Sequence, residues 1–119
     1  MRETDHIEAG RAFMQLAREA DENYRKARNI GWMVAGAHNF FYAAINFIEA
    51  ILAKNNINPE THRDRLKDMR VSGMFSAEEV REHSMLVEAR RKAGYRGQDG
   101  VNYSRIKESA EHFERRVLA

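Results

Sequence analysis

The chain lacks cysteine altogether and has a single proline among its 119 residues. The absence of cysteine excludes disulfides, thiol nucleophiles and cysteine-built zinc sites, and it fits a reducing compartment. The scarcity of proline leaves long helices uninterrupted. Because apolar residues recur at spacings of three and four, and not of two, the sequence predicts an all-α protein.

The chain also lacks a strong excess of charge of either sign. Lys and Arg number 20 against 18 Asp and Glu, so the formal net charge is only +2. Such a balance gives no whole-molecule field that would attract nucleic acid, so any binding of a polyanion must come from a local cluster. The length is that of one domain with one core, and we predict a single domain over residues 1–119.

Targeting and membrane signals are missing as well. The start, MRETDHIEAG, is acidic and polar where a signal peptide is basic and then apolar, so we expect a cytoplasmic protein. The range 29–48 carries no formal charge over about the length that crosses a bilayer, but it contains His38 and two asparagines and ends at Glu49. We interpret it as a buried helix of a bundle and expect no membrane contact.

Motifs for metals and nucleotide phosphates are absent. The glycines of the stretch 94–100 follow a predicted helix, and no Gly-Lys-Ser or Gly-Lys-Thr occurs, which excludes the classical nucleotide-binding folds. Among the pairs with the spacing of two metal ligands on one helix face, the strongest candidates are His38 with Tyr42 and Glu79 with His83. Neither pair has an obvious third ligand, so we predict no metal and no cofactor.

Five helical segments are predicted, over about residues 4–28, 30–55, 58–73, 76–93 and 103–117. Asn58 and Pro59 have the types of an N-cap and a first helical residue, and Gly73 is a typical stop. Ser76 and Glu79 have the spacing of a capping box. Because the connections are short, we expect an antiparallel up-and-down bundle of four to five helices.

The two long N-terminal helices differ in their apolar pattern. The second is apolar almost all round, so it must be covered by the bundle or by a second subunit. The first has one apolar face, predicted from its spacing. The residues of that face are Ile7, Phe13, Met14, Leu16, Ala17, Ala20 and Tyr24.

A polar stripe runs along the second helix. At about 100° per residue, its members fall within an arc of about 100°. They are His38, Asn39, Tyr42, Asn46 and Glu49. The stripe either faces solvent or belongs to a buried or interfacial network, in which Glu49 would need a cationic partner.

The fourth predicted helix could supply that partner. With Val80 and Val87 marking its apolar stripe, Arg91 lies near the middle of the stripe, and Arg90 lies at its edge near His83. Each arginine either lays its methylenes along the apolar face with its head in water or pairs its guanidinium with Glu49.

A basic cluster, THRDR, covers Thr61 to Arg65 near the start of the short third helix. In it, His62 has Arg63 and Arg65 beside it, which would lower the histidine pKa and keep the ring neutral near pH 7. A neutral histidine beside guanidinium groups suits phosphate chemistry, as proton acceptor and charge clamp. The same composition is also common on surfaces.

Four phrases together resemble the small prokaryotic HEPN-domain family. They are AHNFFYAAINFIEAILAKNNI, PETHRDRL, ARRKAGYRG and the terminal amphipathic helix, from about residue 36 onward. The resemblance implies a bundle of four or five helices that forms a homodimer. It also implies binding of nucleotide or RNA, or of a nucleotidyltransferase-type protein partner. Many members are metal-independent ribonucleases, often toxins.

The ribonuclease motif of that family is an arginine, four to six residues and then a histidine. Carried onto this chain, the arginine is Arg90, and Tyr95 stands where the histidine would be. Because tyrosine titrates near 10, it is a poor base at pH 7, and this replacement favours binding over cleavage.

Three functions follow as hypotheses. The first is a HEPN-like module that binds nucleotide, RNA or a partner protein as a dimer, through one polar site between the second, third and fourth helices. The residues predicted to line that site are Tyr42, Asn46, Glu49, His62, Arg65, Arg90, Arg91 and Tyr95. The alternatives are a metal-independent ribonuclease using Arg90 with His62 or Tyr95, and a structural or antitoxin-type adaptor bundle.

Overall fold

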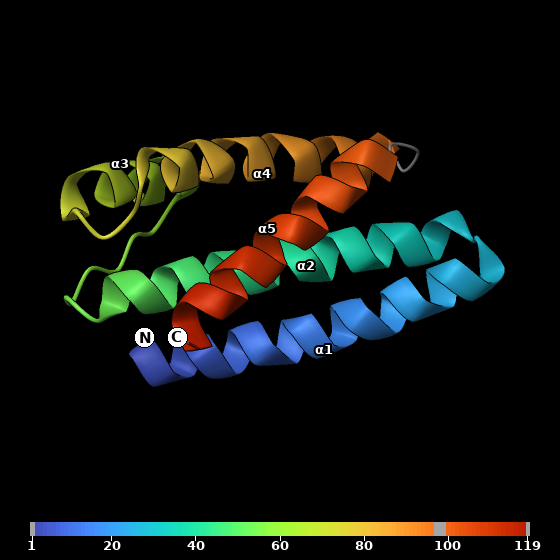
Figure 1. The fold of residues 1–119 in the computed structure, drawn as a ribbon, viewed down its shortest axis with the longest axis horizontal. Coiled ribbons are helices and arrows are strands. Elements are labelled where there is room, and N and C mark those ends of the chain that lie inside the picture. Colours follow the sequence, from blue (N-terminus) through green and yellow to red (C-terminus); the bar gives the residue numbers. More distant parts are fainter. Residues whose placement is uncertain (1, 97–99, 119) are drawn as a thin grey trace.

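The computed structural model describes residues 2–96 and 100–118, with the side chains of 91–96 and 100–101 left undescribed. Its helices are α1 (Glu3–Ala27), α2 (Ile30–Ala53), α3 (His62–Ser72), α4 (Ala77–Arg96) and α5 (Gly100–Leu118) (Figure 1). No strand occurs within the described residues, so the all-α prediction is confirmed.

Helix α2 is the centre of the bundle. α1 runs antiparallel beside it, α4 lies on another side with the short α3 at its beginning, and α5 crosses back obliquely over α2 (Figure 1). All four other helices contact α2. The apolar surface of α2 is therefore covered largely within one chain, although Ile30 and Trp32 at its start stay 50% and 42% exposed.

The reversal between α1 and α2 is a tight two-residue connection. Arg28 ends α1 in the left-handed conformation (φ 52°), and the Asn29 side chain accepts a hydrogen bond from the Gly31 amide at 2.7 Å. This N-cap satisfies one of the free amides at the start of α2. Further along, a Cβ at Gly10 would lie 2.5 Å from the Phe47 ring, so glycine is what allows α1 to approach α2 closely.

The core takes large side chains from every helix. Its fully buried members include Met14, Phe40, Phe47, Met69, Leu86 and Phe113. The last helix is amphipathic, as the sequence predicts: Tyr103, Ile106, Ala110 and Phe113, spaced by three and four, are buried, and Val117 is partly buried. Burial of this apolar surface is the main source of stability of the fold.

The apolar face predicted for α1 is only partly right. Its buried residues are His6, Gly10, Met14, Ala17, Ala20 and Asp21. Leu16, which we placed on that face, is 50% exposed. The buried line includes a histidine and an aspartate, which apolar periodicity does not count, because both find polar partners on other helices.

Two helix ends differ from the sequence prediction. α3 begins after Thr61, whose hydroxyl accepts from the Asp64 amide at 3.0 Å, so Asn58 and Pro59 lie before the helix. α4 passes Ala93 and continues to Arg96. The capping box at the start of α4 is confirmed, since the Glu79 amide donates to Ser76 Oγ at 3.0 Å and the Ser76 amide donates to Glu79 Oε1 at 2.9 Å.

Among the described helices, none has the length and apolar character needed to cross a membrane.

Candidate functional site

The C-terminal half of the polar stripe on α2 lies in a network, where α1 and α3 meet α2. Arg65 from α3 donates to Glu49 Oε1 from both Nη2 (2.9 Å) and Nε (3.3 Å). On the other side, His6 Nδ1 lies 3.6 Å from Glu49 Oε2 and 3.4 Å from Asn46 Oδ1. Glu49 does have a cationic partner, as its place in a network requires, and that partner is Arg65 from α3.

Arg65 is the central residue of this network, with a side chain only 7% exposed. Its Nη1 lies within hydrogen-bond distance of His62 Nδ1 and at 3.4 Å from His83 Nε2. Because a guanidinium has no acceptor, both histidine nitrogens must accept. It follows that His62 carries its hydrogen on Nε2 and His83 carries its hydrogen on Nδ1.

Both of these histidines are held neutral near pH 7. Burial is the main cause that lowers the pKa of His62, and the charges of Arg65 and Arg90 lower it further while Glu49 opposes them. Burial, with the charges of Arg65 and His62, lowers the pKa of His83 to about 4. The expected direction for His62 is confirmed, although Arg63 is not among the causes.

A second arginine and histidine pair lies beside the first. Arg90 Nη2 is 3.3 Å from His38 Nδ1, and the guanidinium carbon lies 5.4 Å from the centre of the Phe41 ring and 5.9 Å from that of Tyr42. Burial and the charge of Arg90 lower the pKa of His38. By the same argument on donors, His38 accepts at Nδ1 and carries its hydrogen on Nε2.

The buried face of α4 differs from the one we predicted. Its buried residues include Glu79, His83, Leu86 and Ala89, whereas Val80 and Val87 are only half-buried. Arg90 lies about 20° from His83 around the helix, so it shares this face. The prediction failed because it counted apolar residues alone. Glu79 is bound by His112 from α5, and His83 Nε2 faces Arg65 from α3, while the buried Nδ1 of His83 has no hydrogen-bond partner among the described residues.

The structure brings most of the predicted site residues together. The members described with their side chains are Tyr42, Asn46, Glu49, His62, Arg65 and Arg90. Arg91 and Tyr95 fall in the part of α4 whose side chains lie outside the described residues.

Three histidines were missing from the predicted set. His38 belongs to the predicted polar stripe, and His83 was placed near Arg90, but neither was counted as a site residue. His6 reaches Asn46 from 40 residues away in the sequence. The only signal for His6 was its place one turn before Gly10 and two turns before Met14, on the buried line of α1.

The two exposed histidines give the site its chemistry. His38 and His62 each have Nδ1 bound by an arginine, and no described residue binds Nε2 of either ring. Each therefore presents a neutral N–H donor. The guanidinium of Arg90 belongs to the same cluster, since it lies beside His38 and its charge lowers the pKa of His62. A surface made of donors suits an anion with several acceptor oxygens.

Within the described residues, no group of three or more histidine, aspartate or glutamate side chains is placed to hold a metal ion. Residues of both candidate pairs have other partners: Glu79 binds His112 at 2.9 Å and His83 faces Arg65, while His38 Nδ1 lies 3.3 Å from Arg90 Nη2. Comparison of the chain with protein-family models, with curated proteins and with solved structures gave no match in any of the three.

Proposed function

We propose that this protein is a HEPN-like helical module that binds the phosphate groups of a nucleotide or RNA on the face formed by α2, α3 and α4. The observation that carries the proposal is the pair of exposed histidines, His38 and His62, each fixed by an arginine with its Nε2–H left as a donor.

The charge arrangement supports an anion. Glu49 balances Arg65 inside the network, so the carboxylate is engaged by its partners and the outer part of the site consists of donors. Phosphate oxygens are acceptors only, and guanidinium and imidazole N–H groups bind them with short, charge-assisted hydrogen bonds. Contacts of this kind position a nucleic acid without reading its sequence.

The test is a calorimetric titration with AMP, with a short RNA and with adenosine, which lacks the phosphate. We expect AMP and RNA to bind and adenosine to bind much more weakly. Arg90→Ala should weaken binding about tenfold or more, because it removes a hydrogen bond to a charged group. Arg63→Ala is the matched control, since Arg63 is exposed and has no hydrogen bond or ion pair with any described residue. Equal affinity for AMP and adenosine would reject the proposal.

A second candidate is the metal-independent ribonuclease, favoured by one observation: His62 is neutral near pH 7 beside two guanidinium groups. A general base needs a free lone pair, however, and the Nδ1 lone pair of His62 is taken by Arg65. Cleavage would therefore require the His62–Arg65 contact to break. The ribonuclease hypothesis is tested by incubating RNA with the purified protein in the presence of a chelator. Cleavage that Arg90→Ala abolishes would support the hypothesis, and intact RNA would reject it.

A further inference from the structure

Helix α3 is attached to the rest of the bundle by few side chains. It lies at one end of the molecule, beside the beginning of α4 (Figure 1). Of its described residues only Arg65 and Met69 are buried, and Val71 near its end is 73% exposed. Met69 belongs to the core, whereas Arg65 is held by polar partners. An element with so little buried apolar surface can open without unfolding the rest of a protein.

The chain on both sides of α3 is anchored to the core. Ile57 before the helix and Phe75 after it both pack against the core cluster. Gly73 ends α3 with a φ of 74°, and a Cβ at this glycine would have no neighbour within 4 Å, so nothing obstructs a turn of the chain there. Residues 58–73, which we call the α3 arm, therefore form a segment with anchored ends and a weakly held middle.

His83 lies where α4 meets α3, and its partner is a guanidinium. The residue is 1% exposed, its Nε2 lies 3.4 Å from Arg65 Nη1, and its Nδ1 has no hydrogen-bond partner among the described residues. The neutral ring accepts from Arg65 at Nε2. A protonated ring has a hydrogen on both nitrogens, so it turns one N–H group against the N–H groups of Arg65 and has no acceptor for either.

The charges that act on His83 come from the α3 arm. Arg65 and His62 both lower the pKa of His83, and burial lowers it further. The carboxylate of Glu49 on α2 is turned to Arg65, and its other oxygen lies 3.6 Å from His6 of α1. A proton added to the ring of His83 therefore meets positive charge across the joint between α3 and α4.

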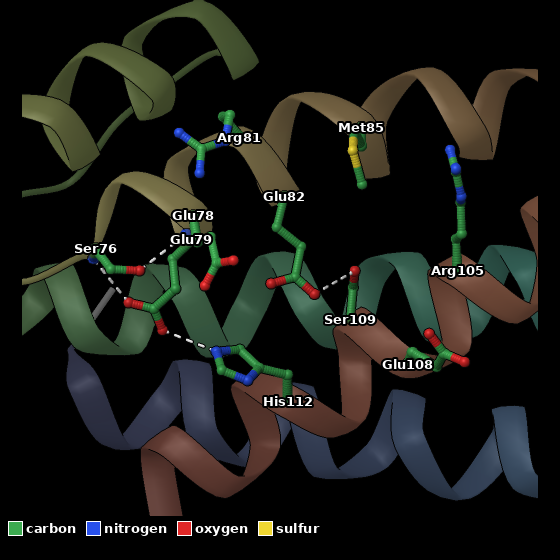
Figure 2. Close-up of a pocket in the computed structure, with 10 residues that line it drawn as sticks. All are labelled: Ser76, Glu78, Glu79, Arg81, Glu82, Met85, Arg105, Glu108, Ser109 and His112. Carbon is green, nitrogen blue, oxygen red and sulfur yellow. Dashed lines mark hydrogen bonds and ion pairs between the residues drawn. The ribbon is translucent and has the colours of Figure 1, made fainter.

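The remaining charged groups around the joint have partners of their own. They are His38 on α2, Glu79 and Arg90 on α4, and His112 and Arg116 on α5. On the α5 side, Figure 2 shows His112 directed at Glu79, in the cleft of about 520 Å³ between α4 and α5. Among the described residues, Arg65 and His62 alone supply charges that shift the pKa of His83. No described carboxylate therefore compensates a charge on that ring.

We propose that the α3 arm is released by acid: His83 takes up a proton from water, Arg65 is expelled from the joint, and the arm swings away while the other four helices stay folded. Opening separates the two positive groups and lets water reach the ring of His83 on the side that the arm covered. Because the arm carries His62, opening also takes apart the proposed phosphate site. That consequence rests on the proposed function, whereas the opening itself does not.

The experiment is hydrogen exchange of the full chain, followed for each amide by NMR at pH 7 and pH 5 and corrected for the intrinsic effect of pH on exchange. At both pH values amides 66–72 of α3 should be less protected than amides 40–52 of α2. Exchange in α3 should also hardly depend on low concentrations of urea, because opening of the arm exposes little surface. The pKa of His83 rises from about 4 toward 6.5 on opening, so the protection of α3 should fall about twentyfold between pH 7 and pH 5.

His83→Gln is the decisive variant. Glutamine does not titrate and can still accept from Arg65, so most of the fall in α3 protection between pH 7 and pH 5 should disappear. His112→Gln is the matched control, because it removes a histidine that binds the same helix one turn away, at Glu79. It should leave the acid response of α3 unchanged.

Two results would overturn the proposal. In the wild type, α3 amides with the protection and the urea dependence of α2 would show that the arm opens only when the whole protein unfolds. In His83→Gln, an undiminished fall in α3 protection would assign the acid response to other groups. The wild-type measurement decides even if the variant does not fold. Since no ligand is present, failure of the opening is seen separately from failure of AMP binding at pH 7.

Discussion

Two polar clusters at the helix junctions are built around opposite kinds of central residue. At one, Asp21 on α1 accepts from Tyr103 Oη at 2.6 Å and from Lys107 Nζ at 3.0 Å, and Arg25 lies at 3.1 Å. At the other, Arg65 donates to Glu49, His62 and His83. An acceptor at the centre uses up the donors around it. A donor at the centre uses up acceptors, and it leaves the Nε2–H of the exposed His62 without a partner among the described residues.

The pKa values of the residues around Asp21 agree with this difference between the two clusters. Burial would raise the pKa of Asp21, but hydrogen bonds from Tyr103 and Lys107, with the charges of Lys107 and Arg25, lower it overall. Burial and the contact with Asp21 raise the pKa of Tyr103. The cluster around Asp21 is therefore a closed structural contact, whereas the one around Arg65 has donors left for a ligand.

The largest effect is expected from Arg65→Ala. It leaves the partly buried Glu49 without its guanidinium and frees the acceptor nitrogens of His62 and His83. Breaking a buried pair costs about 3–5 kcal/mol in the free energy of unfolding. Urea denaturation measures this loss, and Arg63→Ala serves as the exposed control. A loss below about 1 kcal/mol would show that Arg65 is not the central residue.

Acid should weaken the fold through His83. The pKa of His83 is about 4 in the folded protein, against 6.5 for an unperturbed histidine side chain. The unfolded chain therefore binds a proton more readily than the folded chain. The stabilising difference is complete above pH 6.5 and is lost as the pH falls toward 4, by about 1.4 kcal/mol for each pH unit between them. Denaturation at several pH values gives the slope. His83→Gln, which does not titrate, should flatten that slope, and an unchanged slope would assign it to other groups.

Asp21→Ala should cost less, about 2 kcal/mol, because it leaves Tyr103 Oη buried without an acceptor while Lys107 can turn toward water. Glu22→Ala is the neighbouring control, since its ion pair with Lys26 is exposed and should change stability by no more than about 0.5 kcal/mol. AMP binding should be unaffected by Asp21→Ala in folded protein. A loss of AMP binding would contradict the separation of the two clusters.

The helices themselves could be predicted from the sequence. The spacing of apolar residues and the capping box at Ser76 are local properties of the sequence, and the structure agrees with both. Tyr103 and Phe113, which lie on the apolar face of the last helix, are buried. The polar stripe on α2 was equally visible, and Glu49 was identified as the residue that needs a cation.

The partner of Glu49 could not be predicted, and the reason is geometric. Arg65 reaches Glu49 because α3 begins at His62, after the cap Thr61. The start of that helix depends on which of two possible caps, Asn58 or Thr61, the chain uses. His6 belongs to the network only because Gly10 lets α1 approach α2 closely. A helix face that buries charged residues in pairs cannot be recognised from the spacing of apolar residues, because the charged positions interrupt that spacing.

The smallest effects are expected from the exposed histidines. His38→Ala and His62→Ala each remove one neutral N–H donor, worth about 1 kcal/mol, or about fivefold in the AMP dissociation constant. Calorimetry on the two variants and on the double variant measures this. Affinities equal to the wild type would remove the histidines from the site.

The most direct measurement of the account is the nitrogen NMR spectrum of histidine-labelled protein at pH 7, with and without AMP. We expect His62 and His38 to be neutral, with the hydrogen on Nε2 and no hydrogen on Nδ1. We also expect AMP to shift the Nε2 signals and adenosine to leave them unchanged. Rings that are protonated at pH 7, a hydrogen on Nδ1, or signals that AMP leaves unmoved would contradict it.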